Sequence, residues 1–144
     1  LAGHPQVAFV GAIGQPDAHA GELPIAHVEL IAGATVRVEE LLAYAQEHIK
    51  ERAAHPKHIE IMAELPKTAV GKIFKPDLRK MAIKRIYNHA LHSGGIAASV
   101  VDVVEDKKRG LVAQLERSGT ATDDDVMKAL GSFTHPWVWK GEEE

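Results

Sequence analysis

The chain has 144 residues, of which 45% are apolar and 26% are charged, and its formal net charge is -3. This balance argues against disorder, and the length predicts one dominant hydrophobic core. Because the sequence contains no cysteine, a disulfide framework, a thiolate nucleophile and cysteine-ligated zinc are excluded. No apolar stretch approaches the roughly 18 residues of a membrane span, and no signal peptide is evident. We therefore expect a soluble, cytoplasmic protein with no membrane span.

The first part of the chain predicts two neighbouring strands, a helix and a third strand. The runs 6–13 and 24–31 are short and apolar, and turn-forming residues separate them. Over 38–52 the apolar residues recur at helical intervals, which indicates an amphipathic helix. Isoleucines alternate with polar residues in 58–63, which indicates another strand.

A basic cluster follows, divided between a loop and a helix. Residues 64–72 contain proline, glycine and no periodicity, as is typical of an exposed loop that carries function. The apolar spacing then predicts a helix from Pro76 to just before Gly94. Basic residues between 67 and 85 accompany a single acid, Asp77, so they form either a solvated helix face or a surface for phosphates. Nucleic acid is a poor candidate for the partner because the overall charge is acidic.

The last part predicts a β-hairpin and a short helix. Strands over 98–105 and 111–116 flank a charged turn. Thr122 stands three residues before an aspartate, which indicates a capped helix, and Gly131 lies just past the expected helix end. Residues 133–144 show no period, and we expect a docked aromatic segment followed by a frayed acidic tip.

These elements together predict an α+β fold, in which helices flank a small mixed β-sheet and a C-terminal β-hairpin and short helix are added. We expect residues 1–92 to form the main domain. Residues 93–144 are then a hairpin-helix extension that packs on it.

The most specific motif in the chain runs from Pro66 to Arg79 and is Pro66-Lys67-Thr68-Ala69-Val70-Gly71-Lys72-Ile73-Phe74-Lys75-Pro76-Asp77-Leu78-Arg79. It is not a P-loop, because Ile73 stands where that motif requires Ser or Thr. It resembles the last conserved motif of the adenylate-forming superfamily, roughly Pro-x-Thr-x-x-Gly-Lys-Ile-x-Arg/Lys-x-x-Leu-Arg, at every anchoring position. The chain is therefore similar to the C-terminal domain of an AMP-forming acyl-CoA synthetase.

Upstream residues extend this resemblance to about residue 85. They are His4-Pro5-x-Val7, then Gly11, Pro16-Asp17 and Gly21-Glu22-x-Pro24-x-Ala26, in the family's order and at similar spacing. The chain departs from the family in two places. Arg37 stands where a helix cap is usual, and the Tyr-Lys pair often found near Ala54-His55 is absent.

The resemblance implies that Lys72 is the catalytic lysine, which bridges the substrate carboxylate and the adenylate. It implies adenylate or phosphate contacts for Lys67, Thr68 and Gly71, and it makes Lys75 and Arg79 candidates for contacts with CoA or phosphate. The chemistry agrees, because joining a carboxylate to the α-phosphate of ATP brings two anions together and a cation on a mobile loop suits that task.

The resemblance also implies the substrates, the metal ion and the partners of the reaction. The parent enzyme uses ATP and CoA as substrates, with Mg²⁺, and an N-terminal adenylation domain of the same polypeptide is the expected partner. We expect this chain alone to be inactive and to hold no bound cofactor. A protein acetyltransferase acting on Lys72 is a further candidate partner, since acetylation removes the lysine charge.

Other interpretations remain open. The chain could serve a different adenylate-forming enzyme, or it could be a non-catalytic protein-interaction domain whose working part is the extension. The pairs His55 with His58 and His89 with His92 have a spacing that suits zinc, but neither has a third ligand nearby in sequence, so we predict no metal site. The substrate pocket is expected outside this chain, and a fatty or related carboxylic acid is favoured.

Overall fold

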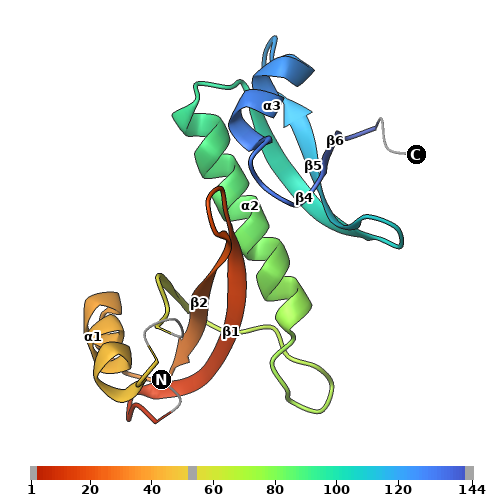
Figure 1. Ribbon diagram of the computed structural model, residues 1–144. Helices are drawn as coiled ribbons and strands as arrows, with labels where there is room; N and C mark the ends of the chain where they lie inside the picture. The colour runs from red at the N-terminus through yellow and green to blue at the C-terminus, as the bar shows by residue number, and fades with distance from the viewer. Residues whose placement is uncertain (1–2, 52–54, 142–144) are drawn as a thin grey trace. The chain divides into compact units, whose positions relative to one another are not determined.

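The computed structural model describes residues 3–51 and 55–141 (Figure 1). The chain divides into two compact units. The first unit comprises Leu1–Gly14 and Leu23–Arg79, and the second comprises Gln15–Glu22 and Lys80–Glu144. The expected boundary near residue 92 stays a prediction.

The first unit is built on a three-stranded sheet with one helix against it. Its elements are β1 (Val7–Asp17), β2 (Gly21–Leu30), α1 (Val38–His48) and β3 (Ile59–Met62), with the ends of β1 and β2 assigned to the second unit. The strand order is β1-β2-β3, and β2 pairs with β3 in parallel, with Ala26 opposite Ile59. Buried apolar side chains of these elements, including Val28 and Leu41, form the core. The predicted order of two strands, a helix and a third strand is confirmed.

Helix α1 begins at Val38 as predicted and ends earlier than predicted. It stops at His48 instead of continuing to 52, because the backbone at Ile49 is already extended. The Ile49 carbonyl oxygen lies 2.6 Å from a ring nitrogen of His55, which holds the chain in this direction. Arg52 lies outside the described residues. At the N-terminus Arg37 makes no side-chain cap, and its Nε donates to Glu40 instead.

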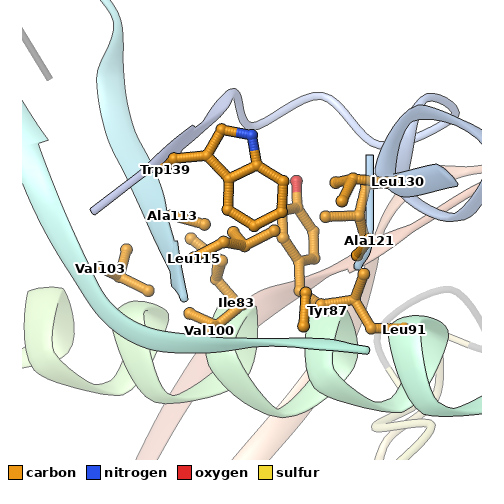
Figure 2. Packing of buried hydrophobic residues seen from close by; sticks show 12 residues of the cluster. Ile83, Tyr87, Leu91, Val100, Val103, Ala113, Leu115, Ala121, Leu130 and Trp139 are labelled. Carbon is orange, nitrogen blue, oxygen red and sulfur yellow. The ribbon is translucent and has the colours of Figure 1, made fainter. Parts of the chain in front are cut away.

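The second unit contains another three-stranded sheet, of order β4-β5-β6. Its elements are most of α2 (Lys75–Ser93), then β4 (Ala98–Asp106), β5 (Gly110–Arg117), α3 (Asp123–Leu130) and β6 (Trp137–Trp139). Strands β4 and β5 pair antiparallel as the predicted hairpin. Tyr87 and Leu91 of α2 pack against this sheet together with Leu130 and Trp139 (Figure 2). The structure confirms the α+β prediction.

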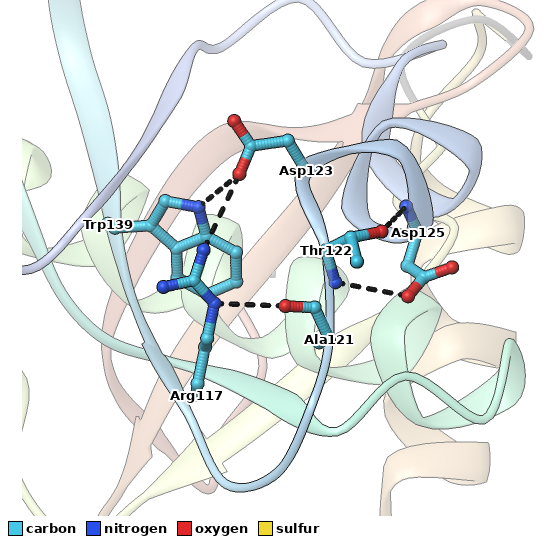
Figure 3. A network of polar contacts seen from close by, with 6 residues as sticks. All are labelled: Arg117, Ala121, Thr122, Asp123, Asp125 and Trp139. Carbon is cyan, nitrogen blue, oxygen red and sulfur yellow. Dashed lines mark hydrogen bonds and ion pairs between the residues drawn. The ribbon is translucent and has the colours of Figure 1, made fainter.

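The C-terminal helix and strand are held by polar contacts (Figure 3). Thr122 and Asp125 form the capping box that the sequence predicted. The Trp139 indole donates to Asp123 over 2.6 Å, and the Arg117 guanidinium lies 3.8 Å from the centre of the Trp139 ring. The expected docked aromatic segment contains strand β6, which pairs in parallel with β5. The acidic tip at 142–144 lies outside the described residues.

Candidate active-site loop

The motif segment folds into a tight turn between Thr68 and Lys72. The Thr68 N–H donates to the Lys72 carbonyl over 2.7 Å, and the Gly71 N–H donates to the Thr68 carbonyl over 2.9 Å. The Lys72 N–H donates to the Thr68 hydroxyl over 3.2 Å. Thr68 therefore fixes the backbone of the turn on both sides.

Gly71 gives this turn its conformation. Its φ is +84°, in the left-handed region where a side chain is unfavourable. A turn followed by a left-handed glycine is a common way to connect two paired strands. The flanking residues Lys67 and Ile73 form an antiparallel bridge, and the Phe74 N–H donates to the Pro66 carbonyl over 2.8 Å. The turn is thus the tip of a short hairpin.

Lys72 presents its charge on the outside of this hairpin. Its side chain is exposed, and no partner for its ammonium group occurs among residues 3–51 and 55–141. The neighbouring Val70 is also 80% exposed. The backbone of Lys72 is hydrogen bonded while its ammonium group is available to a ligand. Such a cation can stabilise negative charge on a carboxylate or a phosphate.

The Lys67 side chain is partly buried and paired, unlike that of Lys72. Its Nζ lies 2.7 Å from Oε1 of Glu29 and 3.3 Å from the Leu65 carbonyl oxygen. The same ammonium group is 4.4 Å from the centre of the Phe9 ring. The Lys67 and Glu29 side chains are 21% and 16% exposed. Lys67 thus directs its charge into the protein, whereas Lys72 directs its charge outward.

Glu29 links the start of the loop to strand β2. Its Oε1 also accepts from the Leu65 N–H over 2.9 Å. The hydrogen bond from Lys67, and then that from the Leu65 N–H, hold the pKa of the Glu29 carboxyl below its usual value. Its carboxylate is therefore ionised at neutral pH and joins Leu65 and Lys67 to the sheet.

The helix that follows the loop begins against strand β1. Leu78 is fully buried, and a Cβ atom added to Gly11 would lie 2.4 Å from its Cδ1 and 3.0 Å from Cγ2 of Ile73. Only a glycine at position 11 allows both side chains this close an approach. The same helix start carries Lys75 and Arg79, both exposed. Because they are four residues apart, they share one helix face.

Residues 1–72 match the family of the AMP-binding enzyme C-terminal domain. The chain belongs to this family. The family predicted from the motif is thereby confirmed, and the matched segment ends at Lys72.

Relatives of this AMP-binding enzyme C-terminal domain include several CoA ligases. A marinolic acid–CoA ligase from a Pseudoalteromonas species is 38% identical over 133 residues, which are 92% of this chain and 20% of that protein. An acetyl-coenzyme A synthetase from Pyrobaculum arsenaticum is 43% identical over 82 residues, which are 55% of this chain and 12% of that protein. The chain spans about a fifth of the first relative and less of the second.

A solved structure also matches the domain. The acyl-CoA synthetase of Brucella canis is 35% identical, with a TM-score of 0.48, over 53% of this chain and 14% of that one. The match to the Pseudoalteromonas ligase extends beyond the family segment, because 133 aligned residues include most of 93–144. The C-terminal part of this domain is therefore shared with at least one CoA ligase.

The structure gathers most of the residues that the motif singled out, and adds one that it did not. Lys67, Thr68, Gly71 and Lys72 belong to one hairpin, and Lys75 follows at the start of α2. Glu29 was not predicted to take part. The only signal for it in the sequence is a carboxylate within the apolar run 24–31.

No metal centre accompanies the loop in the described part of the domain, where no group of three or more His, Cys, Asp or Glu side chains could hold an ion. His58, one of the histidines whose spacing suits zinc, has its Nε2 2.5 Å from Oε2 of Glu60. None of the helices described here combines the length and apolar character that a transmembrane segment requires.

Proposed function

We propose that this chain is the lysine-bearing C-terminal domain of an AMP-forming acyl-CoA synthetase, which converts a carboxylic acid, ATP and CoA into acyl-CoA, AMP and diphosphate. The observation that carries this proposal is the exposed Lys72 on its hydrogen-bonded turn, within a segment that matches the family. The names of the relatives support a CoA ligase over other adenylate-forming enzymes.

Lys72 would act in the first half-reaction. The substrate carboxylate attacks the α-phosphorus of ATP, the bond from that phosphorus to the bridging oxygen breaks, and diphosphate leaves. Negative charge grows on the reacting oxygens as this occurs, and a fixed cation stabilises it more than it stabilises the separate substrates. In the second half-reaction the CoA thiol attacks the acyl carbon and AMP leaves.

The rest of the active site would come from an N-terminal adenylation domain of the same polypeptide. That domain would hold ATP and the acid, and this chain would supply Lys72 to them. Thr68 and Gly71 would act by shaping the turn, and Lys75 and Arg79 would offer positive charge to the phosphates of CoA or ATP. Mg²⁺ would accompany ATP in the adenylation domain, since the described residues of this chain contain no group of three or more His, Cys, Asp or Glu side chains that could hold an ion.

The proposal predicts a clear difference between the parent polypeptide and this chain alone. The parent polypeptide should release AMP and diphosphate from ATP and form a CoA thioester when a suitable acid is supplied. This chain alone should form none, because it supplies only the cation. A panel of carboxylic acids, with chromatographic detection of AMP and acyl-CoA, tests both expectations. Acyl-CoA synthesis by this chain alone, or ADP as the product of the parent polypeptide, would contradict the proposal.

We favour a fatty or related carboxylic acid as the substrate of the parent polypeptide. The relatives include a marinolic acid–CoA ligase and an acetyl-coenzyme A synthetase, so their names do not point to a single acid. The same acid panel therefore decides the substrate class.

Lys72 is also a proposed site of acetylation. Its exposed side chain on a protruding turn is accessible to another protein, and acetylation would remove the charge that the first half-reaction needs. Mass spectrometry of the parent polypeptide after treatment with an acetyl donor and a protein acetyltransferase should find Lys72 modified and adenylate formation reduced. An unmodified Lys72 after this treatment would exclude the acetyltransferase as a partner.

A further inference from the structure

We propose that Glu29 and Lys67 are positioning residues, and that together they form a clamp which holds the Lys72 turn in the orientation that adenylate formation needs. This inference rests on the function proposed for Lys72. It goes beyond that function by assigning a role to a carboxylate on strand β2, far from the motif in sequence.

The clamp is a set of four contacts around one ammonium group and one carboxylate oxygen. Oε1 of Glu29 accepts from Nζ of Lys67 over 2.7 Å and from the Leu65 N–H over 2.9 Å. Nζ of Lys67 also lies 3.3 Å from the Leu65 carbonyl oxygen and 4.4 Å from the Phe9 ring centre. The ammonium group therefore has two hydrogen-bond acceptors and an aromatic ring around it within the first unit, which leaves Lys67 poorly suited to contact a nucleotide.

The clamp is connected to Lys72 through the hairpin. Lys67 immediately precedes Thr68, which accepts hydrogen bonds from Gly71 and Lys72. Lys67 is also bridged to Ile73, the residue that follows Lys72. Holding Lys67 against Glu29 thus fixes both strands of the hairpin whose tip carries the Lys72 ammonium group.

Partial burial makes the pair sensitive to the loss of either member. Both side chains are about one-fifth exposed or less, and Leu65 beside them is buried. Removing Glu29 would leave the Leu65 N–H without its acceptor, and the Lys67 ammonium group with only the longer contact to the Leu65 carbonyl oxygen and no opposite charge. The ammonium group would then turn toward solvent, and the hairpin would lose its attachment to β2.

The rate of adenylate formation should depend strongly on the position of the Lys72 ammonium group. A displacement of about 1 Å in a catalytic group can cost up to about a hundredfold in rate. The hairpin would remain attached at its second strand through Ile73 and the start of α2, so we expect a smaller effect, about tenfold.

The experiment measures the two half-reactions separately in the parent polypeptide. Glu29→Ala is expected to lower the rate of adenylate formation about tenfold and to leave thioester formation from supplied acyl-adenylate unchanged. Glu29→Gln keeps an acceptor for the Leu65 N–H but removes the charge, so it should lose less. The double variant Glu29→Ala with Lys67→Ala should lose no more than Glu29→Ala alone, because the two residues act as one unit.

Hydrogen exchange provides a readout that is independent of catalysis. In Glu29→Ala the amides of Leu65, Thr68 and Phe74 should exchange faster, while those of the central strands should not. The matched control is Glu47→Ala, which removes an exposed carboxylate of helix α1, in the same unit but outside the loop, and should change neither readout.

Comparing Lys72→Ala with Glu29→Ala tests the clamp and the proposed function separately. If Lys72→Ala impairs adenylate formation while Glu29→Ala leaves it and the exchange of the hairpin unchanged, the clamp is refuted and the proposed function stands. Equal losses in both half-reactions of Glu29→Ala would show a general defect in folding, which also refutes positioning. If Lys72→Ala has no effect on adenylate formation, the proposed function fails, and the positioning role fails with it.

Discussion

Lys72→Ala in the parent polypeptide is expected to lower the rate of acyl-CoA synthesis by about a hundredfold or more, which corresponds to about 3 to 4 kcal/mol of lost transition-state stabilisation. The expected loss is large because, under the proposed function, the cation would stabilise charge that develops during the reaction. The hairpin should remain intact, since the turn is held by the backbone of Lys72 and by Thr68. The rate of acyl-CoA formation at saturating ATP and CoA measures the effect.

Lys107→Ala is the matched control for this substitution. Lys107 is an exposed lysine in the turn between β4 and β5, outside the segment that matches the family. Its removal changes the net charge equally and should leave the rate unchanged. A similar loss in both variants would show that overall charge, and not the position of Lys72, determines the rate.

Leu78→Ala is expected to lower the free energy of unfolding by about 2 to 5 kcal/mol. Leu78 is fully buried, and its Cδ1 occupies the space that the missing side chain of Gly11 leaves open. Shortening it removes apolar contacts and creates a cavity between β1 and the start of α2. Urea unfolding of this chain, followed by circular dichroism, measures the change.

Ile31→Ala provides the comparison for Leu78→Ala. Ile31 is 46% exposed, so the same kind of truncation should cost clearly less, because part of the side chain already contacts water. An equal loss in the two variants would contradict the packing described for Leu78.

The strands, helices and family were predictable because their signals are local. The 24–31 run is a short apolar stretch between turn-forming residues, the helix from Pro76 shows its period within a few turns, and the capping box of α3 lies within four residues. Strand β6 has no such signal. It is three residues long, and it is a strand because Ala113 to Leu115 of β5 pair with it. The end of α1 likewise depends on a contact, between Ile49 and His55.

The candidate site likewise contains residues that local sequence predicts and one whose placement depends on a distant contact. Lys72, Thr68 and Gly71 stand within five consecutive residues, and their spacing was enough to predict an exposed loop and to suggest the family. The different placement of Lys67 was not predictable, because its partner Glu29 is 38 residues away in sequence. The motif alone does not distinguish an exposed lysine from a partly buried one. The contact with Glu29 of strand β2 distinguishes Lys67 from Lys72.

The central claim is that this chain delivers the Lys72 cation to adenylate formation and not to thioester formation. The most direct test compares Lys72→Ala with the unchanged parent polypeptide in each half-reaction, using formation of the adenylate from acid and ATP and formation of the thioester from supplied acyl-adenylate and CoA. We predict a loss of about a hundredfold or more in the first and little change in the second. Equal losses in the two half-reactions would contradict the claim.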